Sequence, residues 1–575
     1  MRQYRYFALC FLVSPWFSQC EGIHDLPKII AYQAAPNDYF NTEADRVAQI
    51  YDGFFFNIGA WDQGIPANIG ILPATPSVTD WMDRVGENLI HLNEAGVTEN
   101  LLGVSFSSEA PWPSPETLLS EGYREKMAAH FGSLGKAAKE LGFRGVSIDL
   151  EYPYPRYELD HEIYTYDKYS VEDLLRSSRD QGRAVMSALL DGFPEAVVFV
   201  LPGTLWTRPI DREYLMGAIE AMAERDAPGG MHLGYERAYT LYEYPLTQVA
   251  IPRVGDLEAQ VLLRGEMLDY WKRRCTVAPG VWPTHMVETG GKDYPQKPWK
   301  EELAELRNQM EILRTVAKRY IWSFSGQPLW YLHDSEVEER YGLKKQTLPG
   351  VDEIVPGWQA ILTEKRKATD PKILELVEEV SRFDEGEITA GELCHRFGTP
   401  GEWLVLAPLG NPLTRPAFSQ PNAIFGPIQK DLPYYGRDGA VPWVVFRPME
   451  PLGSVSLRAA LDWIDTDDCS AHLLATIEAP EKTEGLLQLG WDDGIVVRIG
   501  DRVVFDHPDY PEKGHGMLFR DRYLFERKIP VTIPEGKSRL AVTSLNLHGV
   551  WGFNMRFTDP EGFPLKGITF SLPAE

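Results

Sequence analysis

The feature that most constrains the fold is a regular alternation, between residues 28 and 324, of short apolar runs and longer segments with helical spacing. The short runs carry the β-branched and aromatic residues of buried strands. We expect strands at 28–32, 53–58, 101–106, 145–150, 196–201, 231–234, 276–281 and 320–324. We expect helices from about residue 42 and at 77–95, 115–141, 171–190, 212–223, 257–271 and 300–316. Because parallel neighbouring strands need a crossover each time, this series predicts an α/β fold of the (β/α)8 TIM-barrel type.

The alternative to a barrel is an open, doubly wound sheet. A nucleotide-binding sheet of that kind carries a glycine-rich turn after its first strand. The first expected strand, Lys28–Tyr32, is followed by a polar loop without that motif. The sequence therefore favours the closed barrel and indicates no cofactor.

The chain of 575 residues is too long for one core, and its composition changes after the barrel segment. Residues 334–400 are charged and have helical spacing, which predicts a helical extension or linker. From residue 401 onward, short alternating runs separated by Gly, Asp and Pro predict a β-sandwich. Its expected strands include 471–479, 494–499, 502–505, 527–533, 538–544 and 552–558. This domain either binds polysaccharide or braces the barrel, and the sequence leaves both open.

The first 22 residues have the three-part layout of a secretory signal peptide. A positively charged start is followed by the apolar run Phe7–Phe17 and by small and polar residues up to Gly22. We therefore expect residues 1–22 to be a signal peptide, residues 23–333 the barrel, and the mature protein to be periplasmic or extracellular. Lipid attachment at Cys20 is the alternative. No later segment has the length and apolarity of a transmembrane helix.

Cysteine spacing argues against disulfides and bound zinc, and net charge limits the classes of binding partner. Cys275, Cys394 and Cys469 are far apart and form no C-x-x-C pair, so neither a disulfide framework nor a zinc site is indicated. The formal net charge of −26 argues against a nucleic acid or an acidic membrane surface as a partner. A neutral polysaccharide or oligosaccharide fits this charge better. Nothing in the sequence indicates the oligomeric state.

The candidate site begins at the stretch Phe143–Tyr152, where an apolar strand pattern ends in two carboxylates. Side chains alternate along a strand, so Asp149 and Glu151 share one face with their Cα atoms roughly 6.6 Å apart. Two carboxyl groups this close at the mouth of an apolar core are expected to have pKa values that separate into an acid and a base, which is the chemistry of glycosidic-bond cleavage. The alternative is that the acids cap a helix or pair with Arg144 or Arg156.

Aromatic and acidic residues gather after the expected strands, where the loops of a barrel meet at one end. Flat aromatic faces pack against the C–H face of sugar rings, so this composition predicts a saccharide site. The candidate substrate-binding residues are Trp61, Asp62, Trp112, Tyr152, Trp206, Arg208, Tyr235, His285 and Trp322.

Glu151 is the candidate general acid, and its partner is Asp149, Glu288 or Glu236. Carboxyl groups about 5 Å apart favour retention of stereochemistry, and wider gaps favour inversion. The sequence does not provide this distance, so both outcomes stay open.

Two other function classes compete with hydrolysis by carboxylates. The first is a non-catalytic carbohydrate-binding protein on a barrel scaffold. The second is a metal-dependent hydrolase, which needs clustered histidines at strand ends. Only His232 and His285 lie near suitable ends, and no H-x-H follows the first strand, so no metal is predicted.

The stretch Ser147-Ile148-Asp149-Leu150-Glu151 resembles the end of the D-x-x-D-x-D-x-E signature of the chitinase and endo-N-acetylglucosaminidase superfamily of secreted (β/α)8 glycoside hydrolases. The resemblance implies that Glu151 is the general acid and that Asp149 orients the acetamido group of the substrate. Ser147 and Arg144 replace the two earlier acids of the signature, which puts assistance by that acetamido group in doubt. Trp322 is similar to the sugar-stacking Trp of the superfamily.

The C-terminal segment also carries a resemblance. Residues 490–497, with the sequence GWDDGIVV, and residues 550–560 are distantly similar to PA14-type sugar-binding β-sandwiches of bacterial carbohydrate-active enzymes. The resemblance implies an accessory domain over residues 401–575 and assigns it no catalytic residue.

Overall fold

The structure is a computed structural model of the whole chain. It describes residues 26–57, 76–105, 115–150, 169–201, 203–205, 209–236, 239, 245–285, 298–325, 329–331, 335–343, 349–364, 370–411, 428, 434–436, 439–447, 453–461, 467–491, 493–507, 527–547 and 551–574. The expected signal peptide lies outside these residues.

Eight parallel strands form a closed barrel in the order β1 to β8, which confirms the predicted fold and excludes the open sheet. Pairing of β1 with β8, with Lys28 opposite Tyr320, closes the ring. The strands are β1 (Lys28–Ala34), β2 (Gly53–Asn57), β3 (Leu101–Ser105), β4 (Gly145–Asp149), β5 (Val197–Leu201), β6 (Met231–Tyr235), β7 (Thr276–Val281) and β8 (Tyr320–Ser323).

Helices surround the barrel, and two of the expected helices are interrupted. Ser120 caps a new helix within the expected 115–141, and Gly265, with φ of 54°, lies within the expected 257–271. The helices around the barrel are α1 (Asp38–Thr42), α2 (Ala44–Val47), α3 (Pro76–Glu94), α4 (Pro115–Leu118), α5 (Glu121–Leu141), α7 (Val171–Gly192), α8 (Pro209–Glu224), α9 (Pro245–Ala250), the 3₁₀ helix η2 (Ile251–Arg253), α10 (Val254–Leu262), α11 (Glu266–Arg274) and α13 (Trp299–Val316).

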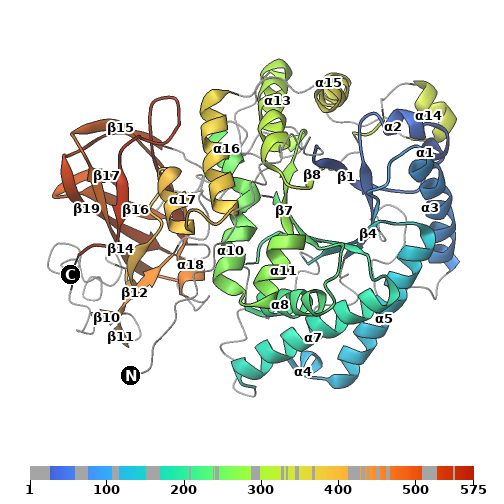
Figure 1. Cartoon of the computed structure of the whole chain (residues 1–575), viewed down its shortest axis with the longest axis horizontal. Helices are drawn as coiled ribbons and strands as arrows, with labels where there is room; N and C mark the ends of the chain where they lie inside the picture. The colour runs from blue at the N-terminus through green and yellow to red at the C-terminus, as the bar shows by residue number, and fades with distance from the viewer. Residues whose placement is uncertain are drawn as a thin grey trace, which may run out of the picture.

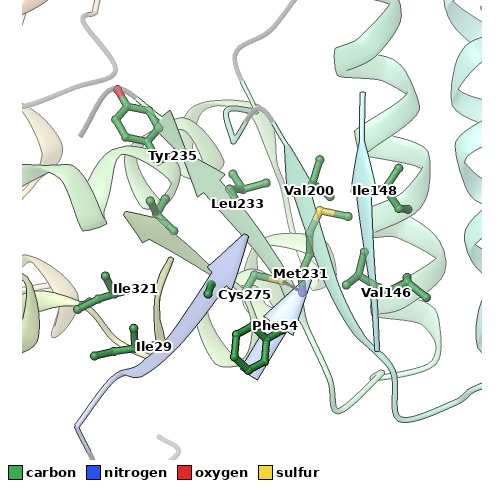
Figure 2. Close-up of a cluster of buried hydrophobic side chains, with 14 of the residues drawn as sticks. Ile29, Phe54, Val146, Ile148, Val200, Met231, Leu233, Tyr235, Cys275 and Ile321 are labelled. Carbon is green, nitrogen blue, oxygen red and sulfur yellow. Dashed lines mark hydrogen bonds between the residues drawn. The ribbon is translucent and has the colours of Figure 1, made fainter. Parts of the chain in front are cut away.

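Side chains on the barrel strands alternate between two layers. One layer packs between the strands and the helices, and it includes Val146 and Ile148 of β4. Figure 2 shows part of this outer layer, with residues from several neighbouring strands. The other layer fills the barrel interior and includes Phe199 of β5 and Trp322 of β8. This alternation decides which residues can reach a site inside the barrel.

Helices α7 and α8 approach one another closely through two glycines. A Cβ atom on Gly182 of α7 would lie 1.9 Å from the carbonyl oxygen of Tyr214, and one on Gly217 of α8 would lie 1.9 Å from the carbonyl oxygen of Arg179. Only glycine permits this backbone contact, so the two helices are fixed against each other along the outside of β4 and β5.

The amino-terminal end of the barrel interior contains a buried histidine, His232 of β6. Its ring packs edge-on against Tyr320, with centroids 4.9 Å apart, and its Nε2 lies 3.0 Å from the Gly229 carbonyl oxygen. Arg319 Nη1 lies 3.2 Å from the same nitrogen. Burial, first, and then the positive charges of Arg319 and Arg144 lower the pKa of His232 from 6.5 to about 3, against the opposing effect of the Gly229 hydrogen bond.

This histidine predicts a loss of stability in acid. In the unfolded chain His232 binds a proton below about pH 6.5, whereas in the folded barrel it does so only below about pH 3. The free energy of unfolding therefore decreases as the pH falls through this interval. Between pH 7 and pH 5 the loss amounts to about 2 kcal/mol. Chemical denaturation of the wild type and of His232→Gln at both pH values measures it, and the variant should lose about 2 kcal/mol less than the wild type. An identical pH dependence in both proteins would contradict this assignment.

A helical extension follows the barrel and comprises α14 (Ser335–Tyr341), α15 (Val351–Thr363), α16 (Pro371–Asp384) and α17 (Ala390–Arg396). Of these, α16 and α17 lie between the barrel and the C-terminal strands, whereas α14 lies beside α1 (Figure 1). Asp384, at the end of α16, forms ion pairs with Arg253 at 2.7 Å and with Lys318 at 3.3 Å. Because the Arg253 side chain is only 7% exposed, this contact joins the extension firmly to the barrel.

The C-terminal residues form two packed antiparallel sheets, as predicted. One sheet contains β9 (Trp403–Gly410), β12 (Trp443–Phe446), β14 (Cys469–Ala479), β16 (Gly494–Ile499), β17 (Arg502–His507), β19 (Gly536–Asn546) and β21 (Thr569–Ser571). The other contains β13 (Ser454–Ser456), β15 (Thr483–Trp491), β18 (Arg527–Ile533) and β20 (Gly552–Thr558). Trp403 of the first sheet contacts Phe553 of the second, with ring centroids 5.8 Å apart, in the core of the sandwich. The hairpin β10 (Tyr434–Gly436) and β11 (Gly439–Val441) and the helix α18 (Leu457–Ala460) complete the described elements of this part.

The sandwich packs on the helical extension through several contacts. The Phe557 N–H donates to the Gly398 carbonyl oxygen at 2.8 Å, and the His395 ring lies 5.7 Å from that of Phe570. Lys372 of α16 lies 3.7 Å from the Asp559 carboxylate. These contacts connect the sandwich to α16 and to the end of α17, and α16 also contacts the barrel through Asp384.

Two further observations concern the described residues. Cys275, Cys394 and Cys469 are all buried, and no disulfide joins any two of these three. In the part of the chain that the structure describes, no helix combines the length and the apolar character needed to cross a membrane.

Candidate active site

The carboxylate of Asp149 lies inside the barrel at its carboxyl-terminal end. Asp149 is the last residue of β4, paired with Ser105 of β3 and Leu201 of β5. Its neighbours Ile148 and Leu150 belong to the outer layer, so alternation turns Asp149 inward. The residue is 8% exposed. The structure therefore places this predicted residue at the end of the barrel where βα loops gather.

A hydrogen bond across the barrel confirms the direction of this side chain. The Tyr32 hydroxyl, from β1, donates to Asp149 Oδ2 at 3.3 Å. Strands β1 and β4 are not neighbours in the barrel, so both side chains must point into its interior to meet. The contact gives the carboxylate a phenolic donor and holds it in one orientation.

Trp322 lies in the interior layer beneath this contact. It is 1% exposed and is surrounded by aromatic rings at centroid distances of 5.4 to 6.4 Å, those of Tyr32, Phe55, Phe199, Tyr239 and Phe324. Gly280 of β7 faces the indole, since a Cβ there would lie 2.9 Å from Trp322 Cε2. Trp322 is therefore enclosed by protein.

A second set of aromatic residues lies one layer closer to the carboxyl-terminal end. Ile30 and Gly280 pair with Trp322, and the next inward positions on these three strands are Tyr32, Trp282 and Phe324. All three are partly exposed. Phe324 contacts Trp282 at 4.9 Å and Tyr32 at 5.4 Å between ring centroids. We call Tyr32, Trp282 and Phe324 the aromatic rim.

Polar residues adjoin the aromatic rim beyond β7 and β8. His285 is 4% exposed and packs edge-on against Trp282, with ring centroids 4.9 Å apart. The hydroxyls of Thr284 and Ser325 lie 2.9 Å apart and are buried. His285, predicted from the sequence, is thus next to the rim.

The two candidates at the end of β6 lie differently. Tyr235 is 3% exposed and belongs to the outer layer with Leu233, as Figure 2 shows. Glu236 follows it, is partly exposed, and its carbonyl oxygen accepts a hydrogen bond from the Tyr239 N–H at 3.0 Å. Glu236 is thus the first residue beyond the carboxyl-terminal end of β6.

The remaining candidate residues lie outside the described part of the chain. They are Trp61, Asp62, Trp112, Glu151, Tyr152, Trp206, Arg208 and Glu288. The described site therefore consists of Asp149, Tyr32, Trp282, Phe324, His285 and Glu236, with Trp322 and Tyr239 beneath.

Sequence reasoning missed Tyr32, Tyr239, Trp282 and Phe324. Tyr32 and Phe324 were placed in expected strands, and Trp282 follows one directly. Counting two positions further along the strand from Ile30, Gly280 and Trp322 would have found Tyr32, Trp282 and Phe324. Tyr239 follows β6 after a short turn, and we know of no sequence signal for it.

The chemistry available in this site is that of a carboxylate at the carboxyl-terminal end of the barrel, with partly exposed aromatic rings in the same interior layer. Such a site offers an acceptor for hydroxyl or amide N–H groups and flat faces for C–H groups of a ring. Within the described ranges, no group of three or more His, Cys, Asp or Glu residues is arranged to hold a metal ion.

Comparisons with known proteins extend only to the fold. No model of a protein family matches the sequence, and a search of curated proteins found no match. Similar solved structures include an exo-β-1,4-mannosidase from Opitutaceae bacterium strain TAV5, with 11% identity and a TM-score of 0.33, over 59% of this chain and 60% of the mannosidase. This chain thus covers less than two thirds of that protein.

In two further solved structures, the aligned region covers a larger share of the known protein. A fungal endo-β-N-acetylglucosaminidase of glycosyl hydrolase family 18 has 14% identity and a TM-score of 0.31, over 59% of this chain and 98% of that one. An endo-1,4-β-mannanase from Eisenia fetida has 10% identity and a TM-score of 0.30, over 61% and 93%. These structural neighbours are glycosidases. At such identities the likeness concerns the barrel fold, which supports many chemistries.

Proposed function

We propose that this protein is a glycoside hydrolase that cleaves O-glycosidic bonds of a polysaccharide or oligosaccharide. The observation that carries the proposal is the Asp149 carboxylate, which points into the barrel at its carboxyl-terminal end beside three partly exposed aromatic rings. This is the position of active sites in (β/α)8 enzymes.

In the proposed reaction, Glu151 is the general acid that protonates the leaving oxygen. The strand pattern of the sequence predicts that Asp149 and Glu151 face the same side of the chain, and the proposal therefore assigns both to one site. Asp149, held by the Tyr32 hydroxyl, orients the substrate or stabilises the positive charge that develops on the sugar ring. Glu288 and Glu236 are the other candidates for the second carboxylate, and its distance from Glu151 decides between retention and inversion.

The aromatic rim supplies the proposed sugar platform. Tyr32, Trp282 and Phe324 are partly exposed, whereas Trp322 is enclosed, so we assign Trp322 the role of supporting the rim from below. His285 beside Trp282 provides a polar contact for a sugar hydroxyl. Trp61, Asp62, Trp112, Tyr152, Trp206 and Arg208 stay in the proposal as substrate-binding loop residues.

The proposal includes export and an accessory role for the sandwich. The layout of residues 1–22 supports a signal peptide, and the net charge of −26 supports a neutral carbohydrate rather than nucleic acid as the partner. The domain limits at residues 22, 333 and 400 are part of the same proposal.

The test is a screen of the purified protein against plant, algal and animal polysaccharides with detection of new reducing ends. Glu151→Gln is screened in parallel, because glutamine keeps the shape of the side chain and cannot donate the proton of an acid. Activity of the wild type that the variant lacks supports hydrolysis. Binding to a polysaccharide by both proteins, without turnover by either, would instead indicate a carbohydrate-binding protein.

A further inference from the structure

A buried carboxylate on α10 binds the residues that follow β5. Glu258 of α10 is 1% exposed. Its Oε1 accepts a hydrogen bond from the Thr204 hydroxyl at 2.6 Å, and its Oε2 accepts one from the Leu205 N–H at 2.6 Å. Both carboxylate oxygens are thus engaged by two successive residues of one segment.

The segment that Glu258 holds follows β5, the strand that pairs with Asp149. Leu201, the last residue of β5, pairs with Asp149, and its carbonyl oxygen accepts a hydrogen bond from the Leu150 N–H at 2.7 Å. Gly203 then passes so close to β6 that a Cβ on it would lie 2.5 Å from the Gly234 backbone. Residues 203–205 are therefore confined between β6 and α10 at the carboxyl-terminal end of the barrel.

A carboxylate is a costly way to fill a buried space. Removing its charge from water is strongly unfavourable unless hydrogen bonds compensate, and an apolar side chain would fill the same volume without that cost. The carboxylate fixes the geometry of the groups that it binds, because hydrogen bonds to a charged acceptor are short, strong and specific in geometry. The arrangement thus specifies the path of the chain from β5 into the following loop.

We propose that Glu258 is a positioning residue for substrate binding, because it fixes the start of the loop that leads from β5, the strand paired with Asp149, to α8. This rests on the proposed function, since residues 206–208 of the loop include two of the proposed substrate-binding side chains. Glu258 itself acts through residues 204 and 205. Substrate affinity, rather than the chemical step, is the quantity that it controls.

Glu258→Gln tests the proposal, because the amide has one acceptor oxygen and its NH₂ group cannot accept the second hydrogen bond. Asp256→Asn is the matched control. Asp256 lies on the same helix, is 8% exposed, and accepts from Trp271 Nε1 and Lys318 Nζ, both at 2.9 Å. Its partners belong to α11 and to the residues before β8, away from β5.

The first measurement is hydrogen exchange of the full-length proteins, followed by mass spectrometry of peptides that contain Leu205. Exchange at this amide should become about 10-fold faster in Glu258→Gln, because it loses a charged acceptor. It should be unchanged in Asp256→Asn. Unchanged exchange in Glu258→Gln would overturn the proposal whether or not the protein is a hydrolase.

The second measurement is kinetics on the polysaccharide that the wild type hydrolyses fastest in the screen. Glu258→Gln should raise KM about 10-fold and leave kcat and its pH profile close to the wild type, and Asp256→Asn should change neither parameter. Equal KM values for both variants and the wild type would overturn the positioning role.

The outcome for Glu258 can be separated from that for hydrolysis. If the wild type binds a panel polysaccharide without cleaving it, affinity gel electrophoresis on that polysaccharide replaces KM, and weaker binding by Glu258→Gln alone still supports positioning. Binding by the wild type to no member of the panel would overturn the positioning role together with the proposed function.

Discussion

Asp149→Asn is expected to lower kcat for glycosidic cleavage about 10²- to 10⁴-fold. Asparagine keeps the shape of the side chain and an oxygen that can accept from the Tyr32 hydroxyl, so the barrel should retain its structure. What is lost is the negative charge at the end of β4 on which the proposed reaction depends. Initial rates from reducing-end detection, with thermal unfolding of both proteins, measure the effect.

Tyr32→Phe is the control for this prediction. It leaves the charge and removes only the hydroxyl that donates to Asp149, so kcat should fall about 10-fold, much less than in Asp149→Asn. A kcat for Asp149→Asn equal to that of the wild type, in a protein with native stability, would exclude Asp149 from the reaction. Equal losses in the two variants would show that the orientation of Asp149 matters more than its charge.

Gly182→Ala is expected to lower the free energy of unfolding of the barrel by about 3 kcal/mol or more. The new methyl group would lie 1.9 Å from the Tyr214 carbonyl oxygen, and this atom belongs to the backbone of α8. Rotation of a side chain cannot relieve such a clash, so the two helices must separate and lose the packing between them. Denaturant unfolding of full-length protein gives the difference.

Gly122→Ala, on α5, is the matched control for the glycine prediction. A Cβ at this position would have its nearest neighbour, Ser120 Oγ, at 3.9 Å. Because alanine favours the helix over glycine, this variant should be as stable as the wild type or more stable, by up to about 1 kcal/mol. If Gly182→Ala behaved like Gly122→Ala, α7 and α8 would not be in backbone contact in solution.

The barrel was predictable because its strands are buried on both faces. Val146 and Ile148 pack under helices while Ser147 and Asp149 face the interior, so β4 shows an apolar run that ends abruptly in acid. The position of that change along the chain was enough to locate Asp149 at the carboxyl-terminal end of the barrel. Periodicity and burial act locally here, and a single sequence carries them.

Other features depend on tertiary contacts that no local pattern contains. The break at Gly265 was missed because one glycine within a helical pattern does not by itself end a helix. Glu258 has the composition of a solvated helix face, and only the packing of α10 against residues 203–205 makes it a buried acceptor. The enclosure of Trp322 likewise depends on rings from four other strands or loops.

In the C-terminal part, two of the longer strands, β9 and β15, were not predicted from the sequence. β15 contains Gly485 and Gly490, and β9 contains Pro408, residues that usually mark the end of a strand. Both strands are nevertheless held in their sheets by long neighbours, β18 and β20 for β15 and β14 for β9. Strand pairing over many residues outweighs the local preference.

The contacts of α16 with both of its neighbours have a mechanical consequence. Asp384 forms ion pairs with Arg253 and Lys318 at one end of this helix, and Lys372 forms one with Asp559 at the other. The helix is therefore a rigid spacer, or strut, between the barrel and the sandwich, and not a flexible tether. With a flexible tether, local concentration falls as the tether lengthens, whereas a strut presents its two ends at one fixed offset. If the sandwich binds a polymer, the bound segment would therefore lie at a fixed distance from the carboxyl-terminal end of the barrel.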